Sequence, residues 1–132
     1  MNLNRMKMEE REKMIVSYIK GYNQFNTEQM VKDFSEDIVF ENRTADAVTL
    51  ETFGLEEFTD QADKAKEYFS KRKQFILEFK HSEHQTEIEL SYVATLAKTL
   101  GNNHQKGSKI RTTGKSIFTF LDGKITNLID IG

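Results

Sequence analysis

The sequence predicts an α+β domain in which helices cover one face of an antiparallel sheet. Three observations predict it. Apolar residues recur at helical spacing early in the chain, and apolar and polar residues alternate through most of its second half. An Asp-Gly pair at 122–123, typical of a two-residue hairpin turn, separates two alternating segments. Because helices come first and strands last, the helices are expected to pack together on one side of the sheet.

The composition limits the function classes. The chain has 132 residues with a net charge of -2, and it contains 10 Phe and 4 Tyr but no Cys and no Pro. Without Cys there are no disulfides, thiolate metal sites or cysteine nucleophiles. The net charge argues against a nucleic-acid binder, and no apolar run approaches the ~20 residues of a membrane span. We expect one cytoplasmic domain over residues 1–132, with residues 1–8 a candidate disordered extension, no nucleic acid and no membrane.

Three helices are expected in the first half of the chain. The first covers about residues 9–24, and its apolar face is Ile15, Tyr18, Ile19 and Tyr22. Asn26 is a candidate N-cap of a short second helix, with Gln29 completing a capping box. Its buried face is Met30, Val31 and Phe34. The third helix follows Gly54 and has the clearest pattern, with apolar residues at Leu55, Phe58, Ala62, Ala65 and Phe69.

Strands are expected elsewhere. A short strand covers 37–42, and residues 43–53 form a loop or a second strand. After Lys71 everything indicates strands, and the four expected ones lie at 75–80, 87–96, 108–121 and 124–131. A strongly curved sheet of such long strands would leave space between itself and the helices. A ligand would bind in that space.

Three stretches carry a resemblance to a known family. They are the helix pair leading into a strand at 18–42, Gly54 opening the third helix at 55–58, and the terminal hairpin at 114–125. In order and spacing they resemble the nuclear-transport-factor-2-like (NTF2-like) superfamily, and within it SnoaL-like and ketosteroid-isomerase-like proteins, over about residues 14–131. The resemblance implies an NTF2-like cone, a curved antiparallel sheet packed by three N-terminal helices around a pocket. It also implies a homodimer through the outer sheet face.

The resemblance further implies residue roles. Ketosteroid isomerases have a Tyr donor on the first helix, an Asp base ending the first strand and an acidic donor on the penultimate strand. Here these positions hold Tyr18, Asn42 and Ser116. Asn42 has no proton affinity useful near neutral pH, which argues against steroid-type isomerisation. SnoaL-like cyclases use an aspartate near the end of the last strand, where Asp130 lies. If Asp130 faces the cone, burial would raise its pKa into the range of a general acid or base.

The candidate site follows from these positions. The candidate catalytic residues are Tyr18 and Asp130, and the candidate ligand-binding residues are Asn42, Ser116, Phe40, Phe58, Tyr92, Phe118 and Leu128. Each also has a plainer structural interpretation, such as a core aromatic, a small filler or an exposed acid at a strand end. No motif indicates a metal or an organic cofactor, because His81 and His84 would point to opposite faces of a strand.

Three functions stay open at this point. The first is a protein that binds a small apolar ligand, ring-containing or acyl, with or without cofactor-independent isomerase, cyclase or lyase chemistry. The second is a non-catalytic dimeric binding or scaffold module. The third uses the basic strand face of Lys109, Arg111 and Lys115 to bind RNA or an acidic partner, and a solvated or dimer-facing surface is favoured over it. A solidly packed cone would favour the scaffold, and a cavity of a few hundred Å³ would favour the ligand binder.

Overall fold

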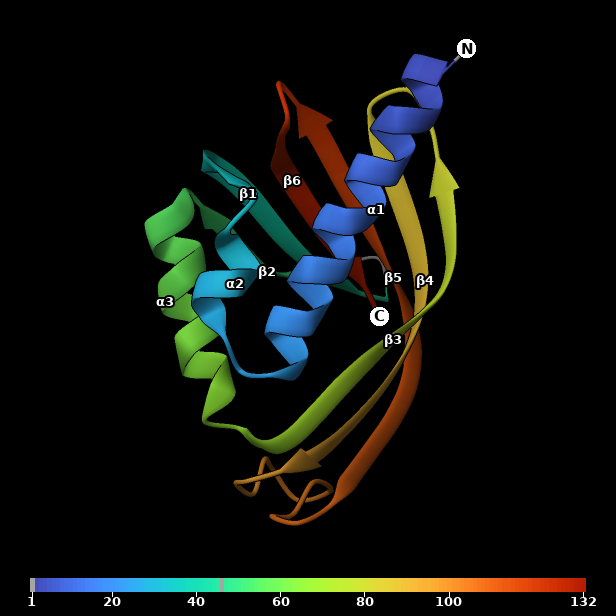
Figure 1. Ribbon diagram of the computed structural model, residues 1–132. Helices are drawn as coiled ribbons and strands as arrows, with labels where there is room; N and C mark the ends of the chain where they lie inside the picture. Colours follow the sequence, from blue (N-terminus) through green and yellow to red (C-terminus); the bar gives the residue numbers. More distant parts are fainter. Residues whose placement is uncertain (1, 46) are drawn as a thin grey trace.

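The computed structural model describes residues 2–45 and 47–132, with side chains from residue 7 onward except 46, and these residues form three helices and one six-stranded sheet (Figure 1). The helices are α1 (Asn2–Asn23), α2 (Thr27–Val31) and α3 (Leu55–Lys66). The strands are β1 (Phe34–Thr44), β2 (Ala47–Phe53), β3 (Phe69–His81), β4 (Gln85–Leu96), β5 (Lys109–Leu121) and β6 (Lys124–Ile131). The α+β prediction is confirmed. α1 begins at Asn2, so the helix includes residues 2–8 of the candidate extension.

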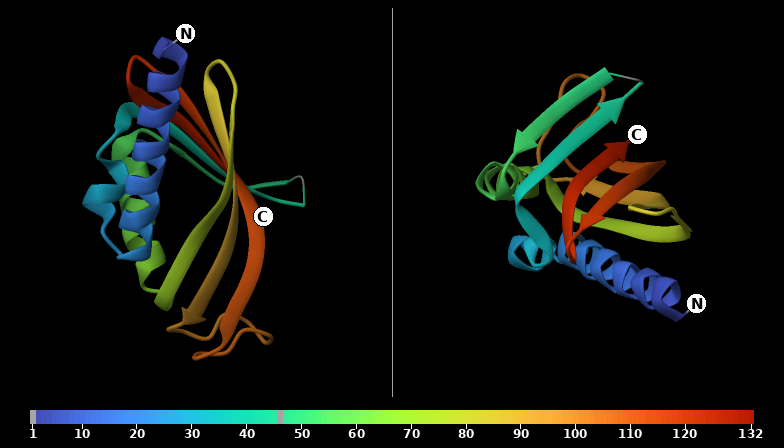
Figure 2. Two further views of the ribbon diagram at one scale, coloured as in Figure 1. Left: turned by 45° about the vertical axis from the view of Figure 1, so that its right-hand side comes forward. Right: turned by 90° about the horizontal axis from the view of Figure 1, so that it is seen from above.

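The strands follow the order β2-β1-β6-β5-β4-β3. Neighbours are antiparallel, as predicted, with one exception that the sequence analysis did not anticipate, the parallel pair of β1 and β6. Parallel neighbours need a long crossover connection, and α3 with β3–β5 provides it here. The long strands bend around the helices, which all lie on the concave side (Figure 2). No described helix is long and apolar enough to cross a membrane.

Two helices end earlier than the apolar spacing predicts. α2 ends at Val31 and α3 ends at Lys66, and Phe34 and Phe69 are instead the first residues of β1 and β3. Both rings still face the interior, since Phe34 is buried and the Phe69 ring meets that of Tyr92. Phe34 and Phe69 are thus apolar and inward-facing, as the helical spacing predicts, but each belongs to the strand that follows the helix and not to a further helical turn. The second strand left open at 43–53 is present as β2.

The junction between α1 and α2 is tightly packed. The Asn26 side chain accepts a hydrogen bond from the Gln29 backbone N–H at 3.1 Å, which confirms the N-cap. The Gln29 amide donates to the carbonyl of Ser17 on α1. A Cβ at Gly21 would lie 2.7 Å from the backbone nitrogen of Met30, so only glycine fits where the two helices meet.

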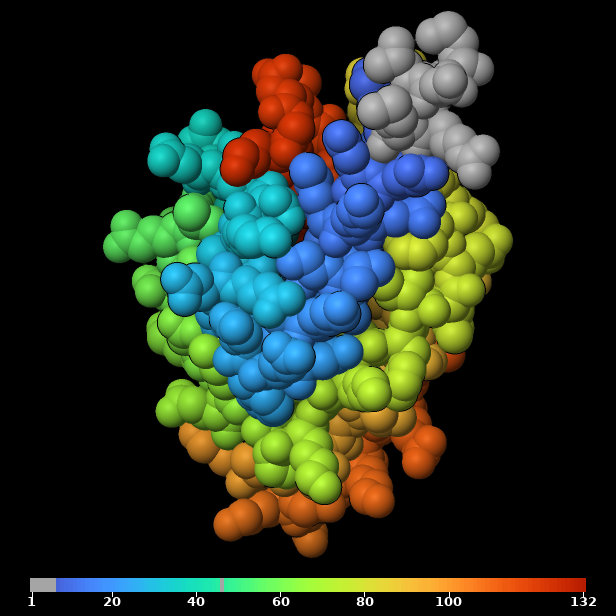
Figure 3. Space-filling model, viewed as in Figure 1, coloured from blue at the N-terminus to red at the C-terminus, as the bar shows by residue number. Residues whose placement is uncertain are grey.

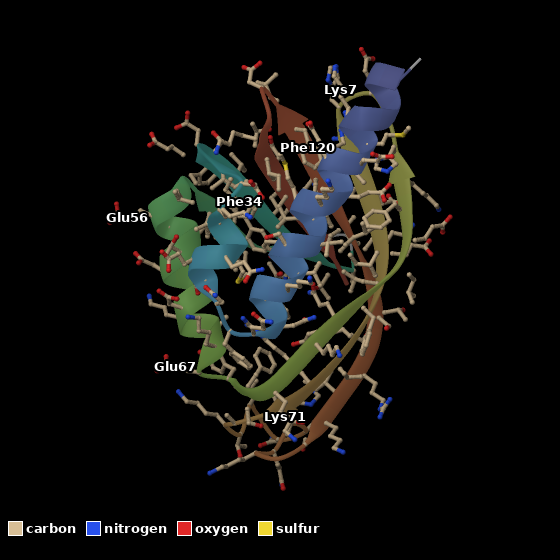
Figure 4. The ribbon with its side chains drawn as sticks, viewed as in Figure 1. Lys7, Phe34, Glu56, Glu67, Lys71 and Phe120 are labelled. Atoms are coloured by element: carbon tan, nitrogen blue, oxygen red, sulfur yellow. The ribbon has the colours of Figure 1, made fainter. Side chains whose placement is uncertain are left out.

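The core lies between the helices and the concave face. Aromatic rings dominate it, with centroid separations of 5.0 Å for Phe34–Phe58, 5.3 Å for Phe40–Phe58 and 5.7 Å for Tyr18–Phe118. Figure 4 labels Phe34 among the side chains between helices and sheet. In the space-filling view the side chains of α1 and α2 close over this region, so the aromatic core is covered on that face (Figure 3). Beyond the core, β3, β4 and β5 extend past the ends of the helices (Figure 1).

Candidate functional site

A hollow of about 310 Å³ lies on the concave face beside the aromatic core, and we call it the Asp130 hollow. It is at the lower end of the range for small-molecule sites. Its lining comes from the end of α1 and from β1 and β3–β6, and it includes four candidate residues, namely Asn42, Tyr92, Ser116 and Asp130. The other strand and helix candidates, Phe40, Phe58, Phe118 and Leu128, do not line it and belong to the core cluster.

Strand register brings the polar candidates together. Ser116 on β5 lies directly opposite Asp130 on β6, and Asn42 on β1 lies beside Asp130 on its other side. Alternation along β5 places Ser116 on the same face as the buried Phe118. The three residues therefore form one row across three neighbouring strands. Asn42 also donates from its amide to the Thr49 hydroxyl at 3.1 Å.

Asp130 is the titratable centre of the hollow. The Ser116 hydroxyl donates to its Oδ1 at 2.6 Å. Burial raises the pKa of Asp130 to about 6, and the hydrogen bond from Ser116 opposes part of that shift. A carboxyl group with a pKa near neutrality can both accept and return a proton under physiological conditions. The contact with Ser116 and the place in the hollow show that the Asp130 side chain faces inward.

Tyr18 lies in the aromatic core, close enough to Asp130 to be affected by its charge. Its ring stacks on Phe34 and meets Phe118 edge-on, so it is packed as a core aromatic and is not among the lining residues. Burial raises the pKa of its hydroxyl well above the ordinary value, the negative charge of Asp130 raises it further, and the positive charge of Arg72 opposes both. The hydroxyl thus stays protonated at neutral pH and lies within electrostatic reach of Asp130.

A pair of tyrosines forms one wall of the hollow. The Tyr22 hydroxyl donates to the Tyr92 hydroxyl at 3.0 Å, which leaves the Tyr92 proton free for a ligand. Burial raises the pKa of both phenols, so both stay protonated at neutral pH. The sequence indicated Tyr92 as a ligand contact and Tyr22 only as part of a helix face. Tyr22 lies one helical turn after Tyr18 on the same face of α1, and this spacing could have indicated that Tyr22 also faces the hollow.

Sequence reasoning missed two inward polar residues of β3. Gln74 lines the Asp130 hollow, and within the described part of the chain its buried Oε1 has no hydrogen-bond partner. Arg72 is 5% exposed; its Nε donates to the Tyr22 carbonyl at 2.8 Å, and its guanidinium lies 3.8 Å from the Tyr22 ring centroid. Both lie in the part of the chain expected to be strand, but they precede the apolar alternation that starts at Phe75, so no pattern indicates which face of the strand they occupy.

His81 and His84 lie away from this site. They border a larger hollow of about 780 Å³ between the start of α1 and the tips of the β3–β4 and β5–β6 hairpins. Both ring nitrogens of His81 have hydrogen-bond partners: Nδ1 lies 2.9 Å from the Thr86 hydroxyl, and Nε2 lies 2.7 Å from the Glu12 carboxylate. His84 is exposed in the turn. Over residues 2–45 and 47–132 no three His, Asp or Glu side chains gather as they would around a metal ion.

Several solved structures have a similar fold. A candidate SnoaL-like polyketide cyclase from Jannaschia sp. CCS1 has a TM-score of 0.78 at 7% identity, over 92% of this chain and 84% of that one. An NTF2-like protein of unknown function from Burkholderia pseudomallei has a TM-score of 0.76 at 9% identity, over 92% and 88%. TerC co-crystallised with polyporic acid has a TM-score of 0.75 at 14% identity, over 92% and 90%.

The chain therefore has the NTF2-like fold, as its sequence motifs predicted. No family model matches the sequence. No curated protein matches it either. At such low identities the similarity defines the fold and not the ligand or the chemistry.

Proposed function

We propose that the protein binds a small apolar ligand, ring-containing or acyl, in the Asp130 hollow and transfers a proton within it without a cofactor. The Ser116–Asp130 pair carries the proposal, because it sets a carboxyl group with a pKa of about 6 in a hollow of ligand size. The structure of TerC with polyporic acid supports it, since it gives this fold a small organic ligand.

The chemistry proposed is proton transfer next to a carbonyl group. Asp130, ionised above its pKa, takes a proton from the carbon beside the ligand carbonyl, and the electron pair moves to the carbonyl oxygen. Tyr92, whose proton is not used by Tyr22, donates to that oxygen. When the deprotonated carbon lies between the carbonyl and a carbon–carbon double bond, the Asp130 carboxyl group returns the proton to the far carbon of that double bond, and the double bond moves next to the carbonyl. Ser116 holds Oδ1, so Oδ2 is the oxygen that moves the proton.

The roles proposed for the remaining residues follow from their positions. Tyr18 stabilises the developing negative charge through its protonated hydroxyl in the core. Gln74 accepts a hydrogen bond from a ligand donor through its unpartnered Oε1. Asn42 orients the ligand and cannot act as the base. The base is thus on the last strand and not at the end of the first.

Deuterium exchange tests this function. Cyclic ketones and acyl compounds are screened for binding by ligand-observed NMR, and the ligands found are incubated with the protein in D2O. The proposal predicts exchange of the protons beside the carbonyl with the wild type, and loss of at least about a hundredfold in rate with Asp130→Asn. Val48→Ala, on the exposed part of β2, is the control. Equal exchange rates for wild type and Asp130→Asn, or no exchange in any bound compound, would contradict it.

A non-catalytic dimeric binding or scaffold module is the second candidate. Two observations favour it: Asn42 stands where isomerases of this fold have their base, and aromatic rings fill the core next to a small hollow. A dimer through the outer sheet face is supported by Phe75 and Leu77, which are 42% and 61% exposed there. A ligand that binds without proton exchange, together with a dimer in sedimentation, would favour this function.

A further inference from the structure

A second hollow, of about 460 Å³, lies next to the Asp130 hollow at the end of the sheet that extends past the helices. We call it the Arg72 hollow. Its border contains no acidic residue, and Arg72 is the basic residue that strand alternation places on the concave face. The other basic border residues are exposed and alternate to the outer face of the sheet, namely Lys71, Lys73, Lys109 and Arg111. Figure 4 labels Lys71 at this end of the molecule.

Arg72 at this hollow is buried without a counter-ion. It is 5% exposed, and among the described residues its buried Nη2 has no hydrogen-bond partner and no carboxylate lies within 4.0 Å of it. Its guanidinium lies beside the rings of Tyr22 and Phe25, at 3.8 and 4.5 Å from their centroids. Aromatic faces compensate a buried cation only in part, and an uncompensated buried charge is costly. An anion at Nη2 would remove that cost.

The two hollows are consecutive along the concave face. Arg72, Ala94 and Ile110 form one row across β3, β4 and β5. The next row, Gln74, Tyr92 and Thr112, lines the Asp130 hollow. Alternate residues on a strand are ~7 Å apart, which is about the length of one aromatic ring with its substituent. A single flat ligand can therefore reach from one hollow to the other.

We infer that the ligand is a small ring-containing carboxylate whose anionic group pairs with Arg72 while its ring extends past Tyr22 toward Asp130. The ring end of this inference rests on the proposed function of the Asp130 hollow. The carboxylate is the anion that matches the planar fork of a guanidinium. The Tyr22 ring packs on Arg72 and also lines the Asp130 hollow, so a flat ring can lie along it between the two hollows, and a tetrahedral phosphate would not use that surface.

A pair of matched probes tests the inference without any variant. Naphthalene-2-carboxylate and naphthalene-2-carboxamide have the same shape and differ in charge, and their affinities are measured by isothermal titration calorimetry at about pH 7.5, where the carboxylate is ionised. We expect the wild type to bind the carboxylate at least about tenfold more tightly than the amide. Equal affinities, no binding of the carboxylate, or tighter binding of inorganic phosphate than of the carboxylate would each overturn the inference.

Two variants locate the charge that is responsible. Arg72→Met keeps a long side chain beside Tyr22 and Phe25, and it is expected to abolish the preference for the carboxylate by lowering the carboxylate affinity much more than the amide affinity. Lys109→Met, which removes an exposed basic residue on the outer face of β5, is the control and should lower carboxylate affinity less than about threefold. A preference that survives Arg72→Met would overturn the assignment. Asp130→Asn separates the two proposals, because it should stop proton exchange and leave the preference for the carboxylate intact.

Discussion

The two halves of the cone are built on opposite principles. On the side of α2 and α3, the space between helices and sheet is filled by aromatic rings in mutual contact, and Phe118, Ile125 and Leu128 are fully buried. Toward the end of α1 the same sheet carries buried polar groups, two of them, Arg72 and Gln74, with unpartnered atoms, whereas the aromatic half has one such atom among the described residues, Thr52 Oγ1. A core stabilises by filling space, whereas buried polar groups cost stability unless something binds them. The difference separates the half that maintains the fold from the half in which we propose that a ligand binds.

Phe118→Ala should have the largest effect, because it removes a fully buried ring from the aromatic half. Phe118 contacts Tyr18 edge-on and has no exposed surface. We expect a loss of about 3–5 kcal/mol in the free energy of unfolding, measured by urea denaturation. Ile117→Ala, on the outer face of the same strand, should cost much less. If both variants lost the same stability, the two faces of β5 would not differ as described.

Asp130→Asn should change stability in a pH-dependent way. The pKa of Asp130 rises from 3.8 in the unfolded chain to about 6 in the folded protein. Between these values the folded protein binds more protons, so the contribution of Asp130 to stability is greatest below pH 3.8 and falls as pH rises toward about 6. Above that window the wild type should be less stable than Asp130→Asn by up to about 3 kcal/mol.

Urea denaturation of both proteins at several pH values measures this difference. The gap between them should close as pH falls to about 4, where Asp130 is protonated in the folded state. Val48→Ala on the exposed part of β2 is the control, because it removes no titratable group, and its difference from the wild type should not vary with pH in this way. A constant difference between wild type and Asp130→Asn would mean that the Asp130 pKa is not raised.

Tyr92→Phe should affect binding more than stability. It removes the hydroxyl that accepts from Tyr22 and leaves the ring in place. We expect a loss of about 1 kcal/mol in the free energy of unfolding. The affinity for any ligand found in the Asp130 hollow should fall about tenfold, because its hydrogen bond to the Tyr92 proton is lost. An unchanged affinity would remove Tyr92 from the site.

Arg72→Met should have the smallest effect on stability. It should leave stability unchanged or raise it, whereas a substitution in the core lowers it. Replacing a buried unpaired charge by an apolar side chain of similar length is neutral or stabilising. Thermal unfolding is expected to shift by no more than a few degrees, and upward rather than downward. A loss comparable to that of Phe118→Ala would show that Arg72 belongs to the structural half of the cone.

The aromatic half was predictable from the sequence, and the polar half only in part. Helical spacing identified Ile15, Tyr18 and Ile19 as buried, and strand alternation grouped Ser116 with Phe118. These signals are local and strong. The motifs around them also sufficed to predict the fold, because the order of helices and hairpins defines its topology.

β3 shows why the polar half was harder to predict. A bulge between Ile76 and Glu78 changes which alternate residues face inward, so Leu77 is exposed and Phe79 packs against the core. Arg72 lies before the alternating run, in a segment whose composition is typical of a charged surface. Its burial follows from tertiary contacts with Tyr22 and Phe25, which no local pattern records. Tertiary register likewise decides that Asp130 faces Ser116.

The carboxyl titration of Asp130 tests the central claim most directly. Its side-chain carbon can be followed by ¹³C NMR across the acidic and neutral range, with Asp130→Asn to assign the resonance. Burial beside Ser116 predicts a midpoint near pH 6. A midpoint near the ordinary value of 3.8 would mean that the Asp130 carboxyl group is solvated, and the proton-transfer site would not exist.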